Sequence, residues 1–243
     1  MNRTNHFSKR AAGFSLIELM VAMVMAFVVL GVLITIYLSS SQSVQFQTSV
    51  QRVEENGRFA IDQLSRTIRM AGYDQPLNTF VVDTPVIKGS INSSGALISL
   101  PNLKEGADTL SVRYEGGTKI RDCLGNAVAE DTYVTAVFGI STDNNLVCGT
   151  SPSNSTPVAE GVEDMILIYG VDSDGDGLPN REVRPGNVTD WSQVVSVRIA
   201  ILVNSVSNAL ITPDTVCLGC RRFAGTADRM LRAEFQSTVG IRN

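Results

Sequence analysis

The sequence predicts an α+β protein, in which one long N-terminal helix packs on an antiparallel β-sheet head. Two observations lead to this prediction. From Phe14 to Leu38 every side chain is uncharged except Glu18, and apolar residues then recur at three- and four-residue steps as far as Ala71. From Tyr73 onward, alternating segments and polar turns are typical of strands. We therefore expect residues 14–38 to form an apolar, membrane-length half of the helix, 39–72 an amphipathic half, and 73–243 a β-rich head.

The amino-acid composition of the chain argues against several classes of function. Of the 243 residues, 44% are hydrophobic, which is enough for one sizeable core. Arg3, Lys9 and Arg10 precede the apolar run, and the rest of the chain has 17 basic and 24 acidic residues, a net charge of −7. We therefore expect no direct nucleic-acid binding through a basic face. The only histidine is His6, which disfavours the usual serine and cysteine nucleophile chemistry and histidine zinc sites. We expect a protein that is not an enzyme.

The N-terminal segment has several possible interpretations. A secretory signal peptide would end at an A-x-A-like cleavage site, and none closes this run of about 25 residues. A plain signal anchor fits the length, and the absence of basic residues from residue 11 to residue 51 places the N-terminus in the cytoplasm. That reading does not explain Glu18, because a carboxylate at mid-bilayer costs roughly 2.5–3.5 kcal/mol on insertion scales.

The stretch "GFSLIE", from Gly13 to Glu18, resembles the prepilin processing signature of type IV pilins and type II secretion pseudopilins. The resemblance implies a type IV pilin-like fold. It also implies that a prepilin peptidase cleaves after Gly13, so that residues 1–13 are a leader peptide, and that the new terminal amine of Phe14 is methylated. The apolar helix then stays in the mature protein. The chain would lie in the bacterial inner membrane, with its head in the periplasm, before it enters an extracellular pilus.

Cleavage would explain why an acid is kept in the apolar run. It creates a positive amine at Phe14, four residues before Glu18. Glu18 of an incoming subunit can neutralise the Phe14 amine of its neighbour, and an apolar environment strengthens this attraction. We therefore expect Phe14 and Glu18 to set the docking register during assembly. The alternative is an acid that is simply tolerated near the membrane interface.

The head shows several strand patterns and two polar loops. We expect strands in the segments 109–115, 132–140, 165–171, 193–206 and 233–243. The polar stretches "INSSGA" (91–96) and "GTSPSNSTP" (149–157) are expected to be loops. The helix should stop at Gly72, ahead of Pro76.

Two head segments carry a narrower resemblance. The stretches "VEDMILIYGVDSDGDG" (162–177) and "STVGIRN" (237–243) are similar to the minor pilin family called PilW, whose fold is similar to that of J-type minor pseudopilins. The resemblance implies a minor pilin that helps to start type IV pilus assembly, at or near the tip, with other minor pilins and the major pilin as partners. The alternatives are a minor pseudopilin of a type II secretion system, and a tip adhesin or DNA-uptake pilin.

An acidic loop is a candidate Ca²⁺ site. Asp172, Asp174 and Asp176 alternate and Gly177 follows, which resembles the start of an EF-hand loop. The twelfth position lacks the usual glutamate, so Glu182, one place earlier, Asp190 or backbone carbonyls would complete the ligand shell. The alternative is a solvated acidic turn, because Asp and Gly are ordinary turn residues.

The four cysteines suggest disulfides in an oxidising compartment. Three pairings are open. We favour Cys123 with Cys148 and Cys217 with Cys220, because the members of each pair are close in sequence. Zinc is the competing reading, although only "CLGC" has tight ligand spacing.

Overall fold

The computed structural model describes residue 13 and the segments 15–73, 85–91, 96–210, 215–219, 221–224 and 228–241. The chain forms two compact units, Met1–Phe46 and Gln47–Asn243. We describe each unit separately.

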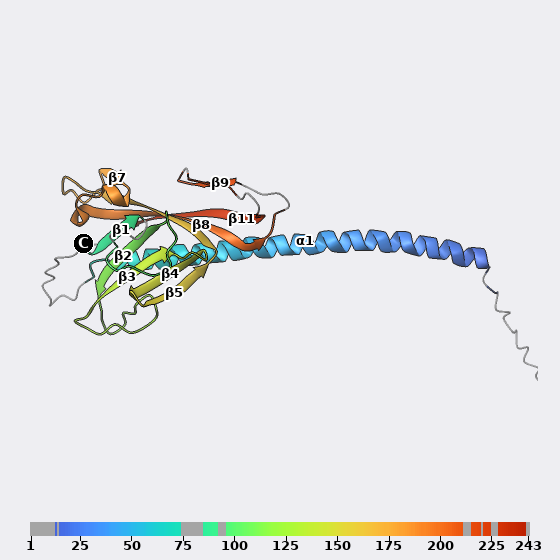
Figure 1. Ribbon diagram of the computed structural model, residues 1–243, viewed down its shortest axis with the longest axis horizontal. Helices are drawn as coiled ribbons and strands as arrows, with labels where there is room; N and C mark the ends of the chain where they lie inside the picture. The colour runs from blue at the N-terminus through green and yellow to red at the C-terminus, as the bar shows by residue number, and fades with distance from the viewer. Residues whose placement is uncertain are drawn as a thin grey trace, which may run out of the picture. The chain divides into compact units, whose positions relative to one another are not determined.

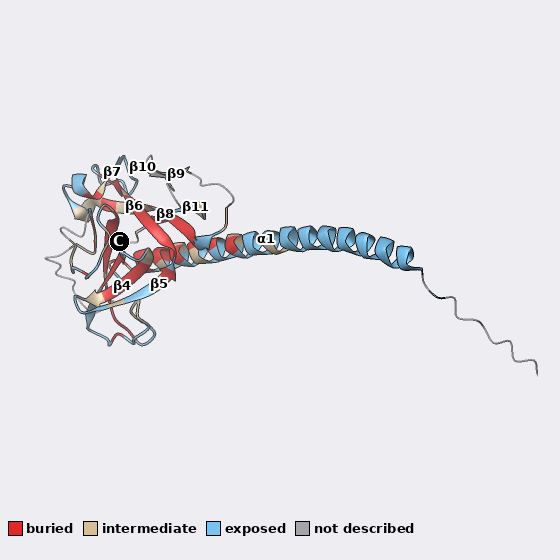
Figure 2. Cartoon of the chain, turned by 45° about the vertical axis from the view of Figure 1, so that its right-hand side comes forward, coloured by how far each residue is buried: buried red, intermediate tan, exposed pale blue. Residues whose placement is uncertain are grey.

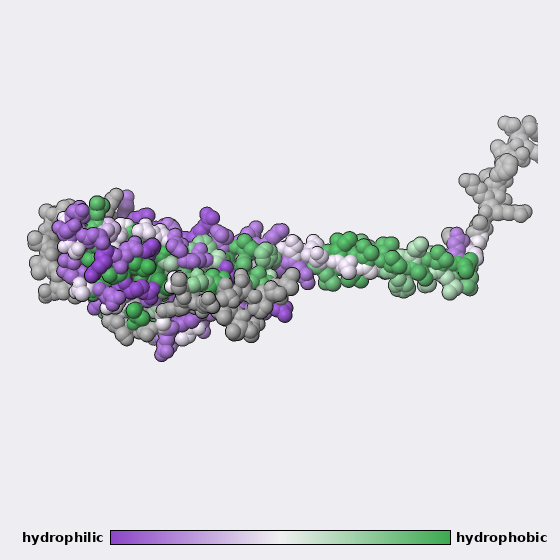
Figure 3. Space-filling view, turned by 90° about the horizontal axis from the view of Figure 1, so that it is seen from above, coloured by the Kyte–Doolittle hydropathy of each residue, from purple (hydrophilic) through white to green (hydrophobic). Residues whose placement is uncertain are grey.

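Helix α1 (Leu16–Arg69) begins in the first unit. The carbonyl of Ser15 accepts hydrogen bonds from the N–H groups of Glu18 (3.1 Å) and Leu19 (3.2 Å), which starts the helix. Residues 16–40 are all exposed, as the pale blue ribbon in Figure 2 shows, and hydrophobic side chains cover the helix there (green in Figure 3). This part of α1 therefore buries no side chain against the other described residues, as expected of a helix that lies in lipid or packs on another helix.

The other end of α1 lies in the second unit and closes near the predicted position. The last helical residue is Arg69, and Gly72 follows in the left-handed region with φ +71°. Its N–H donates to the carbonyl of Arg113 (3.1 Å), so the end of the helix is hydrogen-bonded directly to the sheet. Glycine favours this conformation because it has no Cβ.

The head contains two main antiparallel sheets (Figure 1). The first has the order β1-β2-β3-β4-β5, with β1 (Ile87–Ile91), β2 (Asp108–Glu115), β3 (Tyr133–Ile140), β4 (Asn145–Ser151) and β5 (Asn154–Glu160). The second has the order β11-β8-β6-β7, with β6 (Val162–Val171), β7 (Arg181–Val183), β8 (Val194–Asn208) and β11 (Met230–Gly240). A separate hairpin joins β9 (Thr215–Leu218) to β10 (Arg221–Ala224), and two short 3₁₀ helices are η1 (Pro185–Asn187) and η2 (Trp191–Gln193).

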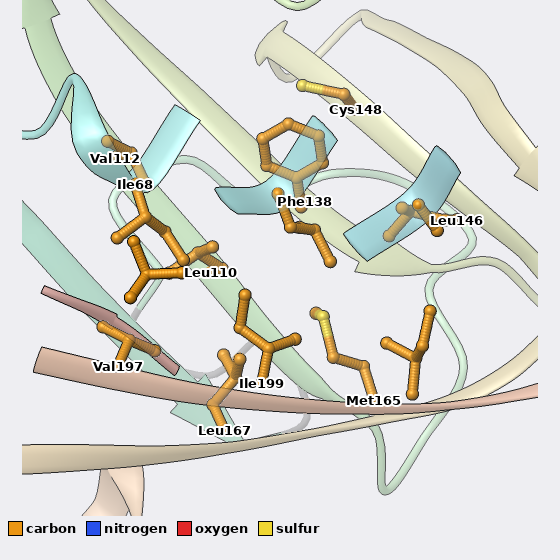
Figure 4. Packing of buried hydrophobic residues seen from close by; sticks show 14 of the residues in the cluster. Ile68, Leu110, Val112, Phe138, Leu146, Cys148, Met165, Leu167, Val197 and Ile199 are labelled. Carbon is orange, nitrogen blue, oxygen red and sulfur yellow. The ribbon is translucent and has the colours of Figure 1, made fainter. Parts of the chain in front are cut away.

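The core lies where one stripe of α1 meets the inner faces of both sheets. The stripe consists of the buried residues Val53, Ala60, Leu64 and Ile68, at the spacing of one helix face. The sheets contribute fully buried side chains, several of which are shown in Figure 4: Leu110, Phe138, Leu146, Met165, Leu167 and Ile199. The predicted α+β class, with one long helix on antiparallel sheets, is confirmed.

Most strand predictions hold, and one loop prediction is wrong. Strands β2, β3, β6, β8 and β11 cover most or all of the five segments predicted from alternation. The segment 149–157 is not a loop, because it forms the end of β4 and the start of β5 around a turn at residues 152–153. The side-chain Oδ1 of Asn154 accepts from the N–H of Thr150 (3.1 Å) and of Ser151 (2.7 Å), which closes this turn. Polar side chains are compatible with strand here because β5 is an edge strand with one exposed face.

Gly57 permits a close contact between α1 and the second sheet. A Cβ built on Gly57 would lie 2.2 Å from the Phe235 ring of β11, closer than any real contact allows. Because glycine has a hydrogen in place of a Cβ, the aromatic ring can occupy this space. Phe235 lies in the predicted strand segment 233–243, but the requirement for glycine opposite it could not be predicted from the helix pattern.

We predict that Gly57→Val lowers the free energy of unfolding by about 1–3 kcal/mol, because the new side chain overlaps the Phe235 ring. The thermal midpoint of the detergent-solubilised chain should fall by about 2–4 °C per kcal/mol. Gly240→Val is the matched control, since a Cβ there has no neighbour within 4 Å. Equal midpoints for the two variants would show that the Gly57 contact is unimportant.

Candidate functional site

The processing and assembly residues lie at the start of α1. Gly13 is exposed, and a Cβ built on it would have no neighbour within 4 Å, so the main chain there is open to a peptidase. Phe14 lies outside the described residues. Glu18 is in the first turn of α1 and is exposed.

No basic residue lies close to Glu18 in the sequence. Between Arg10 and Arg52 the chain has no basic residue, and Glu18 is the only acid before Glu54. The exposed apolar side chains of residues 16–38 surround it along the helix. In an apolar medium a neutralising group for Glu18 must therefore come from a new amine at Phe14 or from another chain.

The acidic loop between β6 and β7 is organised around one carboxylate. Asp172 is buried, and its oxygens accept from the N–H groups of Asp174 (3.2 Å), Gly175 (2.7 Å) and Gly177 (2.7 Å). These hydrogen bonds, that of Gly177 foremost, hold the pKa of Asp172 below its usual value. The loop therefore keeps a charged Asp172 at neutral pH and wraps its backbone around it.

The structure brings together three of the four predicted metal ligands. One carboxylate oxygen from each of Asp172, Asp174 and Asp176 can lie within 4.8 Å of the others. Glu182 is not in this group, since it lies on β7 and forms an ion pair with Arg198 of β8. Asp190, another acid near the loop, accepts from the N–H of Ser192 (2.9 Å) and caps η2. Three aspartates alone supply fewer oxygens than the six to eight that Ca²⁺ takes, so backbone carbonyls or water would complete the shell.

An open pocket lies beside the acidic loop. Its lining combines Asp172 and Gly177 from the loop with Gln193 of η2, Val195 at the start of β8 and Gly240 at the end of β11. The pocket thus lies where the strands of the second sheet end.

One of the two predicted disulfides is confirmed. Cys123, in the loop after β2, is bonded to Cys148 of β4, with their Cα atoms 6.3 Å apart. This bond ties the long 116–132 connection to the first sheet. Cys217 is exposed and forms no disulfide with any described residue, and Cys220 lies outside the described residues. The Cys217–Cys220 pair stays a prediction.

Comparison with known families gives two matches. The family model of the type IV pilus-assembly protein W matches residues 131–243, and the prokaryotic N-terminal methylation motif matches residues 8–36. The head of the chain is thus similar to this pilus-assembly family, and its N-terminus carries the methylation motif. The methylation motif spans Gly13, Phe14 and Glu18, and the PilW match spans the acidic loop, β8 and β11. Both resemblances drawn from the sequence are thus confirmed.

Two further comparisons concern whole proteins. No curated protein sequence matches this chain. Among solved structures, the chain is similar to a type IV-like pilin from Thermus thermophilus, with 14% sequence identity, 78% of this chain and 97% of that chain covered, and a TM-score of 0.46.

The three clustered aspartates of the acidic loop lead to a prediction about Ca²⁺ binding. We expect millimolar Ca²⁺ to raise the thermal midpoint by several degrees relative to chelator, because a cation relieves the repulsion among three clustered carboxylates. Asp174→Asn should remove most of this shift. Asp143→Asn, which changes an exposed aspartate in the turn between β3 and β4, should leave it intact. Equal midpoints with Ca²⁺ and with chelator would identify a solvated turn.

Proposed function

We propose that this chain is a minor pilin that helps to initiate type IV pilus assembly and is incorporated at or near the pilus tip. The observation that carries the proposal is the joint presence of a methylation motif on an exposed apolar helix and a PilW-family head. The family match supports a role in type IV pilus assembly. The proposal adds two points to this role. It places the chain at or near the tip, and it names other minor pilins and the major pilin as partners.

Processing is the first step of the proposed role. By length and composition α1 can cross a membrane, since its most apolar 18-residue window has a mean hydropathy of 2.9 and is entirely unburied. Basic residues precede the apolar run and none follows it before Arg52, so residues 1–13 face the cytoplasm and the head faces the periplasm. A prepilin peptidase cleaves after Gly13, removes the leader and methylates the amine of Phe14. Residues 14–38 remain as the membrane anchor.

Assembly follows from the charge that cleavage creates. Two unit charges 4 Å apart attract by roughly 4 kcal/mol at an effective dielectric constant of 20. This is comparable to the roughly 2.5–3.5 kcal/mol that one carboxylate costs at mid-bilayer. Glu18 therefore becomes tolerable when it meets the Phe14 amine of a neighbouring pilin, and a shifted register leaves both charges unpaired. The pairing thus favours recruitment in one register.

The alternative functions would use the same N-terminal processing. A minor pseudopilin of a type II secretion system would carry the same cleavage signature, and the match of residues 131–243 to the pilus-assembly family favours the pilus. A tip adhesin would require ligand binding by the head. DNA uptake through a basic face is disfavoured by the net charge of −7 after residue 13.

We predict that a strain lacking this chain has at least tenfold fewer surface pili, and that complementation with Glu18→Ala fails to restore them. The reason is that the variant leaves the Phe14 amine of its neighbour without a partner. Sheared surface pilin on immunoblots and electron micrographs measure the outcome.

Glu55→Ala is the matched control, because Glu55 is an exposed acid on the same helix beyond the apolar run. It should restore piliation. Full piliation with Glu18→Ala would refute the role in register. A deletion that abolishes secretion of extracellular enzymes while pili persist would favour the pseudopilin.

A further inference from the structure

Strand β11 forms one edge of the second sheet (Figure 1). It is 11 residues long, and its register with β8 is continuous from Arg232 to Gly240. The only irregularity lies between Met230 and Arg232, at its beginning. An edge strand of this length presents a straight row of backbone groups to whatever lies beside it.

The direction of these backbone groups follows from one hydrogen bond. The N–H of Ile241 donates to the carbonyl of Val195 (2.9 Å), so in this antiparallel ladder the odd-numbered residues of β11 bond to β8. The N–H and C=O groups of Glu234, Gln236 and Thr238 therefore point away from β8. Within the part of the chain that the structure describes, these backbone groups have no recorded partner. The three side chains are exposed as well.

The other sheet edges carry the features that block strand addition. Strand β5 contains Pro157 and has two register shifts against β4. Strand β7 has three residues and β1 has five. Strand β11 contains neither proline nor lysine, and its register is unbroken over the exposed half. Natural sheets protect free edges by such devices, and along Glu234–Gly240 only the charge of Glu234 is of this kind, so the edge stays open to pairing with a strand that complements this charge.

We propose that β11 binds an extended segment of a different pilin-like chain by strand addition, with a basic side chain opposite Glu234. The proposal rests on the proposed function, because it assumes that the partner is another pilin. Backbone hydrogen bonds along Glu234–Gly240 would supply affinity, and alternate side chains would supply specificity.

Charge selects the class of partner. Arg232 is already neutralised by ion pairs with Glu163 (2.7 Å) and Asp228 (2.8 Å). Glu234 is thus the charge that the outer face of β11 presents, and among the described residues its carboxylate accepts only from the side-chain amide of Gln236 (2.5 Å). A second copy of this acidic chain would bring another net charge of −7, so a basic segment of a different chain fits better.

The partner's side chains follow from the pleat. Residues on the face that holds Phe235 and Val239 would extend the apolar layer of the core, since Phe235 is only half-buried there. Residues on the opposite face would lie beside Glu234, Gln236 and Thr238. The segment therefore alternates apolar and polar residues, with Lys or Arg in the polar set.

Gln236→Pro tests the strand addition in the full-length chain, expressed in a deletion strain. Proline removes the outward N–H of residue 236 and leaves the ladder to β8 intact, as edge strands tolerate. Gln236→Val is the matched control, because it keeps the N–H and favours strand. A benzophenone amino acid placed at Thr238 reports what lies beside the edge after irradiation of living cells.

We expect the valine variant to give a photo-adduct that maps to an extended segment of a distinct pilin-like chain. The proline variant should give at least tenfold less adduct and fewer surface pili. Both variants should melt within a few degrees of the parent. If proline unfolds the chain, Glu234→Lys replaces it, because reversed charge repels a basic segment without changing the backbone.

Three results would overturn the proposal. An adduct with a second copy of this chain would show that the partner is wrong. An adduct unchanged by proline and by Glu234→Lys would show that the edge is not used. Absence of any adduct, together with normal piliation of the proline variant, would have the same meaning. Because Glu18→Ala is measured separately, its loss of pili alongside a silent β11 edge would leave the proposed function standing.

Discussion

One carboxylate in an apolar helix constrains the rest of this molecule. Glu18 has no basic residue within reach along its own sequence, from residue 11 to residue 51, and the side chains around it are exposed and apolar. The only nearby group that processing could turn into a cation is the amine of Phe14. An acid placed in this way is unfavourable in an isolated subunit and favourable in an assembly, because a neighbouring chain can supply the missing charge.

The head provides a second kind of interaction with a different chemistry. Its core is closed on the helix stripe by contacts such as Gly57 against Phe235, so the second half of α1 belongs to the head. The helix charge pair is the same for every subunit with this signature and cannot distinguish partners. A strand edge with a defined charge and side-chain pattern can distinguish them. Register in the membrane and partner choice at the head would then be separate functions of separate surfaces.

Local periodicity explains what the sequence could predict. The helix, the five strand segments and the Cys123–Cys148 pair depend on spacing along the chain, and all appear in the structure. The β4–β5 hairpin was missed because its polar residues resemble a loop when the neighbouring strand is unknown. Glu182 was grouped with the aspartates by counting along a loop, yet β7 directs it to Arg198. The buried pair of Glu163 and Arg232 joins residues 69 positions apart, and no local pattern reports such a contact.

Mass spectrometry of the native polypeptide tests the central claim most directly. The account predicts a chain that begins at Phe14 and carries one methyl group on its terminal amine, so that a cation exists four residues before Glu18. A chain that still carries residues 1–13 would have no such cation at the edge of the helix. That result would contradict the charge pairing and the assembly role built on it.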